Sequence, residues 1–261
     1  MNRFRIIEKG LCCDVYYDKS LKEHKLALFL YGFPATIGEN ELTGELVKRG
    51  YMVLQPHYYG TYDSEGDFTP DSAFRSVNSI IDITRKSVVT NLKSNQITTI
   101  PQKISLCIGY SFGAYVLRHS LNQLIDVENV LLFSPVMSNC PQNQLCWANE
   151  NALEHLQYVL RTRPYTYRIK DTSMWINKYV NDEMASCSLQ NYNVKKVAWI
   201  IGSKDDTIIK PVIIDRHEKV AHDLINPNAE SKLIIVENGA HGINSLVNDN
   251  LMQQLDAFMG L

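Results

Sequence analysis

Long basic runs and long apolar runs are both missing from this chain of 261 residues. Its 26 lysine and arginine residues are balanced by 28 acidic residues, without the basic stretch that marks a nucleic-acid binder. No segment approaches the apolar length that crosses a membrane, and residues 1–10 lack the apolar core of a signal peptide. We therefore expect a cytoplasmic protein without a nucleic-acid or membrane partner.

Metal-binding spacings are missing as well. Neither CxxC nor HExxH occurs, and the seven histidines are scattered along the chain. The cysteine pattern favours reduced thiols over disulfides, because Cys12 and Cys13 are adjacent and Cys107 lies in an apolar, strand-like run. We expect no metal site, and we expect Cys107 to be a packing residue.

What is present is the composition and alternation of an α/β protein. Hydrophobic residues make up 45% and charged residues 21% of the chain, as in globular domains. Strand-like apolar runs alternate with amphipathic helical segments, which is typical of βαβ units around a mainly parallel sheet. Residues 3–8 and 11–17 predict an opening hairpin joined by Lys9-Gly10, and further strands are predicted at 25–31, 51–55, 103–108, 127–133, 197–201 and 232–236.

The predicted helices lie between these strands. One presents Leu42, Leu46 and Val47 on a single face and ends near Gly50. Another begins at Thr69-Pro70, a favourable start for a helix. Its apolar stripe comprises Phe74, Val77, Ile81 and Val88. Three more are predicted after Gly113, near 211–225, and at the end of the chain.

The regular alternation lapses between residues 135 and 192. This segment is aromatic, and Leu153, Leu156 and Leu160 are spaced as one face of a helix. We predict a small helical lid at 135–192, inserted into a core domain formed by residues 1–134 and 193–261.

The pentapeptide Gly109-Tyr-Ser111-Phe-Gly113 lies between a predicted strand and a predicted helix. Glycines at these two positions allow the sharp turn that exposes a nucleophilic serine. A serine hydroxyl needs an imidazole to take its proton and a carboxylate to orient that imidazole. Downstream, Asp205 follows the strand at 197–201 and His241 follows the strand at 232–236.

With the chain order Ser, Asp, His, the sequence resembles the α/β-hydrolase superfamily from Leu26 to Leu255. The resemblance implies an α/β-hydrolase fold with Ser111 as nucleophile, Asp205 as acid and His241 as base. Asp206 is the competing acid, but the family spacing fits Gly202, Asp205 and Ile208.

Two backbone donors are expected for the oxyanion. One is the N–H of Phe112, directly after the nucleophile. By resemblance to the family's HG-x-P signature, the segment Tyr31-Gly-Phe33-Pro34 supplies the second from the N–H of Phe33. Dipeptidyl-peptidase-type members of the prolyl oligopeptidase family carry a comparable tyrosine that contacts the oxyanion, so the Tyr31 phenol is a further candidate. The alternative is that the Tyr31 ring packs against its strand or the loop after residue 56.

Substrate contacts are predicted from two aromatic segments. His57, Tyr58 and Tyr62 lie in a loop expected at the catalytic edge of the sheet, although the same loop suits a packed polar turn. In the lid, Trp147 and Trp175 are candidates for lining a pocket for the acyl or aryl group, or for forming the lid's own core.

These features predict a serine hydrolase that cleaves a small or medium carboxylic ester, or a thioester or amide, through an acyl-enzyme on Ser111 without a cofactor. An acyltransferase or small peptidase using the same triad is an alternative. A ligand-binding member of the fold with little turnover is another, but its mark would be a lost triad residue, and none is lost.

Overall fold

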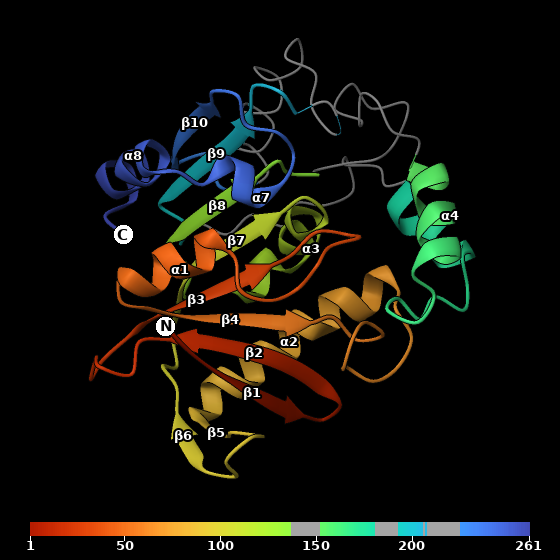
Figure 1. The fold of residues 1–261 in the computed structure, drawn as a ribbon, viewed down its shortest axis with the longest axis horizontal. Helices are drawn as coiled ribbons and strands as arrows, with labels where there is room; N and C mark the ends of the chain where they lie inside the picture. The colour runs from red at the N-terminus through yellow and green to blue at the C-terminus, as the bar shows by residue number, and fades with distance from the viewer. Residues whose placement is uncertain (137–151, 181–192, 206, 208–224) are drawn as a thin grey trace.

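The computed structural model describes residues 1–136, 152–180, 193–205, 207 and 225–261 (Figure 1). The helix predicted near 211–225 falls almost wholly outside these described residues. Among them, no helix combines the length and the apolar character needed to cross a membrane.

An eight-stranded sheet forms the centre of the molecule, in the order β1-β2-β4-β3-β7-β8-β9-β10. The hairpin strands pair antiparallel, β2 pairs antiparallel with β4, and every pair from β4 to β10 is parallel. The strands comprise β1 Asn2–Glu8, β2 Leu11–Tyr17, β3 Lys25–Leu30, β4 Tyr51–His57, β7 Ile104–Tyr110, β8 Asn129–Phe133, β9 Lys196–Gly202 and β10 Glu230–Val236. The predicted hairpin and the mainly parallel sheet are therefore confirmed.

Alternating side chains divide the core into two layers, because successive residues of a strand point to opposite faces. On β3, Leu28 and Leu30 join the layer that contains α2 (Pro70–Lys86) and α3 (Phe112–Ser120). Phe29 joins the opposite layer, with α1 (Glu41–Lys48), α7 (Ile243–Leu246) and α8 (Asp249–Met259). Helices consequently cover both faces of the sheet (Figure 1).

The helix starts follow their sequence signals. Thr69 caps α2 in a reciprocal capping box with Ser72, and Pro70 occupies the first turn. The predicted stripe extends too far, however, because α2 ends at Lys86 and Ser87 adopts a left-handed conformation with φ of 56°. Val88 instead lies in β5 (Val88–Thr90), which pairs with β6 (Ile97–Thr99) in a small second sheet that the sequence did not predict.

The described part of segment 135–192 contains α4 (Ala152–Thr162), α5 (Ser173–Trp175) and the short π-helix η2 (Ile176–Val180). Figure 1 shows α4 on the side toward which β4 runs. The segment contacts the core through a β-bridge between Thr61 and Tyr167, and buried residues such as Leu156 and Trp175 join the α2–α3 layer. Its division from the core as a separate lid stays a prediction.

Candidate active site

Ser111 occupies the turn between β7 and α3. Its φ of 53° and ψ of −119° are unusual for a residue with a side chain, and such backbone strain is typical of functional sites. The turn is held by the Ser111 N–H, which donates to the carbonyl oxygen of Phe133 at 2.9 Å. The start of α3 presses closely on β3, since a Cβ atom at Gly113 would stand 1.9 Å from the carbonyl oxygen of Leu30. Only glycine fits there.

The three predicted triad side chains form a continuous chain of contacts. His241 Nε2 lies 3.2 Å from Ser111 Oγ, and His241 Nδ1 lies 3.1 Å from Asp205 Oδ2. The side chain of Asp205 is fully buried, whereas that of His241 is 21% exposed and thus open to an incoming group. The second carboxylate oxygen, Oδ1, accepts the Thr207 N–H at 3.1 Å. Because that bond anchors Asp205, its carboxylate faces the imidazole in a fixed orientation.

Tyr110 lies beside the histidine. Its ring centroid is 5.5 Å from that of His241. Tyr110 is also the residue that directly precedes the nucleophile. Burial raises the pKa of the Tyr110 phenol to about 12, and the nearby Asp205 carboxylate adds to the shift. Near neutral pH the phenol therefore stays uncharged beside the imidazole.

The segment after β3 lies directly against the nucleophile. A Cβ atom at Gly32 would stand 3.1 Å from Cβ of Ser111, so the backbone of Tyr31–Phe33 borders the serine hydroxyl. The Phe33 and Phe112 rings lie 5.7 Å apart, and Phe112 opens α3, where backbone N–H groups lack partners within the helix. The two residues predicted to donate to an oxyanion are thus neighbours next to Ser111.

Side chains from the segment 152–180 hold this loop. His155 Nε2, on α4, lies 3.0 Å from the carbonyl oxygen of Phe33. The hydroxyl of Tyr167 accepts the Ala35 N–H at 2.8 Å, and Arg163 donates to the carbonyl oxygen of Ala35 at 3.3 Å. Residues more than a hundred positions away along the chain therefore position the loop beside Ser111.

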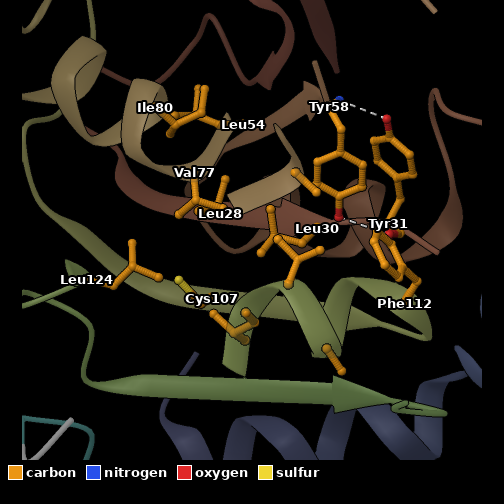
Figure 2. Close-up of a cluster of buried hydrophobic side chains, with 14 of the residues drawn as sticks. Leu28, Leu30, Tyr31, Leu54, Tyr58, Val77, Ile80, Cys107, Phe112 and Leu124 are labelled. Atoms are coloured by element: carbon orange, nitrogen blue, oxygen red, sulfur yellow. Dashed lines mark hydrogen bonds between the residues drawn. The ribbon is translucent and has the colours of Figure 1, made fainter. Parts of the chain in front are cut away.

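Tyr31 turns its hydroxyl into the protein interior (Figure 2). The hydroxyl accepts the Tyr58 N–H at 3.0 Å and lies 2.9 Å from Thr61 Oγ1. Thr61 Oγ1 donates its own proton to the carbonyl oxygen of Tyr58 at 2.8 Å, so the Tyr31 phenol is the donor between the two hydroxyls. These bonds support the packing role for Tyr31 over contact with an oxyanion.

The predicted substrate contacts are mostly buried. His57, Tyr58 and Trp175 have no exposed surface, which argues against direct contact with substrate. The Trp175 indole donates to the carbonyl oxygen of Phe68 at 3.0 Å and stacks on Phe33.

Two candidates remain to be placed. Tyr62 is partly buried, and its hydroxyl donates to the carbonyl oxygen of Ala35, so it supports the loop beside Ser111. Trp147 lies outside the described residues.

Cys107 is completely buried in the layer that Figure 2 shows, and burial raises the pKa of its thiol far above the usual value. Both observations support the packing role predicted for Cys107.

Many solved structures share this architecture. Est1E from Butyrivibrio proteoclasticus matches with a TM-score of 0.57 at 12% identity, covering 99% of this chain and 98% of that one. The esterase RhEst1 from Rhodococcus sp. ECU1013 matches with a TM-score of 0.63 at 11% identity, covering 100% of this chain and 99% of that one. The Pyrococcus furiosus esterase Pf2001 matches with a TM-score of 0.60 at 15% identity, covering 99% of this chain and 91% of that one.

At such low identity the likeness defines the fold and not the reaction. No protein-family model matches the sequence, and no curated protein does. The chain has the α/β-hydrolase fold, as the sequence predicted, with a mainly parallel sheet and helices on both faces.

Proposed function

We propose that this protein is a serine hydrolase that cleaves carboxylic esters through an acyl-enzyme on Ser111. The observation that carries the proposal is the unbroken contact chain from Asp205 through His241 to Ser111, at 3.1 and 3.2 Å. A serine hydroxyl becomes nucleophilic when an adjacent base takes its proton, and these contacts provide that base, while the strained turn at Ser111 holds the hydroxyl at the start of α3.

In this mechanism Asp205 accepts the Nδ1–H of His241 and so leaves the Nε2 lone pair facing the serine hydroxyl. As Ser111 Oγ attacks the ester carbonyl, His241 takes the hydroxyl proton. The N–H groups of Phe112 and Phe33 donate to the oxyanion of the tetrahedral intermediate. His241 then gives its proton to the departing alcohol, and a water molecule, activated by the same imidazole, releases the acid.

A small or medium ester is the proposed substrate class. Three of the structural neighbours support this choice. RhEst1 and Pf2001 are described as esterases, and a further solved structure of Est1E has ferulic acid bound. Tyr31 is assigned a structural role in this proposal, because both its proton and its acceptor site are occupied by Tyr58 and Thr61.

Labelling with a fluorophosphonate probe tests the proposal. Wild-type protein should be labelled and should hydrolyse p-nitrophenyl acetate, whereas Ser111→Ala should lose both properties. Ser105→Ala is the matched control, because Ser105 lies on the same strand and its hydroxyl bonds the carbonyl oxygen of Leu26 away from the triad. Equal labelling of wild type and Ser111→Ala would show that Ser111 is not the nucleophile.

The substrate is tested separately with p-nitrophenyl esters of graded acyl length beside aminoacyl naphthylamides. Preferential hydrolysis of the esters supports an esterase, and preferential cleavage of the amides supports a peptidase. Formation of a new ester when an alcohol is added, in place of free acid, identifies acyl transfer.

A further inference from the structure

A thiol, an imidazole and a carboxylate converge at a second place in the fold, outside the triad. Cys12 lies on β2, His57 is the last residue of β4, and Asp63 lies in the turn that follows. One potential ligand atom from each lies within 4.8 Å of the other two. We propose that these residues bind a divalent transition-metal ion such as Zn²⁺ through Cys12 Sγ, His57 Nδ1 and an oxygen of Asp63.

The fold brings the three residues together through strand register and one serine. Cys12 is directly opposite His57 in the β2–β4 pair, so both side chains point to the same face. The hydroxyl of Ser64 accepts the Cys12 N–H at 2.8 Å and donates to the carbonyl oxygen of His57 at 2.5 Å. Asp63, the neighbour of Ser64, is thereby fixed beside both strands.

One nitrogen of the His57 ring is available to a metal ion. The ring is completely buried, and Nε2 lies 3.2 Å from Asp14 Oδ2. A carboxylate only accepts, so Nε2 carries the proton in the neutral ring and Nδ1 presents a bare lone pair. Within the described part of the chain Nδ1 has no hydrogen-bond partner, and its separation from Asp63 Oδ2 is 3.8 Å. An imidazole oriented by a carboxylate is how protein metal sites commonly hold histidine.

The chemistry of the other two groups suits a metal cation. Cys12 is buried, and a metal ion that binds its sulfur displaces the thiol proton to solvent. Thiolate, imidazole and carboxylate together form a donor set that zinc accepts, with the fourth position taken by water. The Cys12 thiolate and the Asp63 carboxylate would then offset the charge of the cation, with Asp63 shared between the ion and Arg5.

Asp63 is the ligand able to close the site. Its side chain is 56% exposed, and Oδ2 is bound by the Arg5 guanidinium at 2.6 Å. Oδ2 is also the oxygen that lies 3.8 Å from His57 Nδ1, so the carboxylate has to turn to give one oxygen to the ion while the other keeps Arg5. Zinc bonds of about 2.0–2.3 Å place neighbouring ligand atoms roughly 3.5 Å apart. The cluster therefore has to contract by about 1 Å, a movement that the exposed Asp63 side chain allows.

Titration of the full chain with Co²⁺ tests the site without using catalysis. Binding to a thiolate gives a near-ultraviolet charge-transfer band, which we expect in the wild type and in Cys13→Ser but not in Cys12→Ser. Cys13 is the matched control, since it is equally buried but faces the α2–α3 layer on the other side of β2. The absence of the band in the wild type, or its persistence in Cys12→Ser, would overturn the proposal.

A second pair of variants keeps the test decisive if Cys12→Ser does not fold. Asp63→Asn should weaken Zn²⁺ binding at least about 10-fold, whereas Asp67→Asn, at a partly buried acid of the same loop that pairs with Lys170, should bind as the wild type does. Equal Zn²⁺ affinity of these two variants would remove Asp63 from the site. Thermal denaturation with EDTA checks that each variant is folded.

Discussion

Gly202 and Gly239 are in direct backbone contact, because a Cβ atom at residue 202 would stand 2.2 Å from the carbonyl oxygen of Gly239. Gly202 ends β9 just before the loop that carries Asp205, and Gly239 precedes His241 by two residues. The N–H of Lys204 donates to the same carbonyl oxygen at 2.8 Å. This contact therefore sets the spacing between the acid and the base of the proposed triad.

Gly202→Ala should consequently reduce catalysis by separating the two loops. A shift on the order of 1 Å in a catalytic group typically lowers activity about 100-fold. Gly242→Ala is the control from the histidine loop, because a Cβ atom there meets no atom within 4 Å and φ is −66°. Comparing kcat/KM for p-nitrophenyl acetate distinguishes the two variants, and a folded Gly202→Ala protein with full activity would contradict the role of this contact.

Asp205→Asn tests the acid of the triad. The amide cannot hold His241 in the tautomer that accepts the serine proton, so we expect kcat to fall by about 10⁴-fold with little change in folding. Asp206→Asn should have a far smaller effect on kcat. Steady-state kinetics of the two variants, with circular dichroism to check folding, decide between the acids, and the reverse result would assign the role to Asp206.

Tyr31→Phe separates a structural phenol from a catalytic one. Removing the hydroxyl leaves the buried Tyr58 N–H and Thr61 without their partner, which should lower the free energy of unfolding by about 1–3 kcal/mol. The value of kcat should stay unchanged. Tyr16→Phe is the control, because the buried Tyr16 hydroxyl has no hydrogen-bond partner among the residues described. A large loss of kcat in a stable Tyr31→Phe protein would place the phenol on the oxyanion.

The proposed triad was visible in the sequence because each member has a local signal. Ser111 lies in GxSxG, and Asp205 and His241 each follow a parallel strand. The carboxyl ends of such strands meet at one edge of the sheet, so three local patterns predict one site. The chain order Ser, Asp, His adds the family resemblance, and the observed contacts agree with that expectation.

The residues that hold the loop beside Ser111 had no such local signal in the sequence. His155 and Tyr167 contact Phe33 and Ala35, which are 122 and 132 residues away, and no periodicity reports a contact of that range. The sequence did not indicate the burial of His57 either. The pattern places His57 in a loop, whereas in the structure it is the last residue of β4 and contacts Asp14. For the same reason, the absence of a zinc motif in the sequence carried no information on side chains that meet across two strands.

The ionisation of Asp14 should make the stability of the folded protein depend on pH. Burial alone would raise the pKa of its carboxyl, but hydrogen bonds from His57 and Arg5 outweigh this and hold the pKa well below the usual range. Since the pKa is lower in the folded than in the unfolded protein, the carboxylate contributes its full stabilisation above about pH 4. That stabilisation is lost as the pH falls from there toward the folded-state pKa.

Asp14→Asn should therefore destabilise the protein most at neutral pH, by about 3 kcal/mol, because Arg5 and His57 lose their anionic partner. Below about pH 4 the difference from the wild type should shrink, since the wild-type carboxyl then gains a proton in the unfolded chain while it stays charged in the folded chain until the pH approaches its lowered pKa. Urea unfolding at several pH values, with EDTA present throughout, measures the difference. Asp82→Asn, at an exposed aspartate of α2, should change stability little at any pH, and an Asp14→Asn deficit that stays constant into acid would show that the stabilisation does not come from the charge on Asp14.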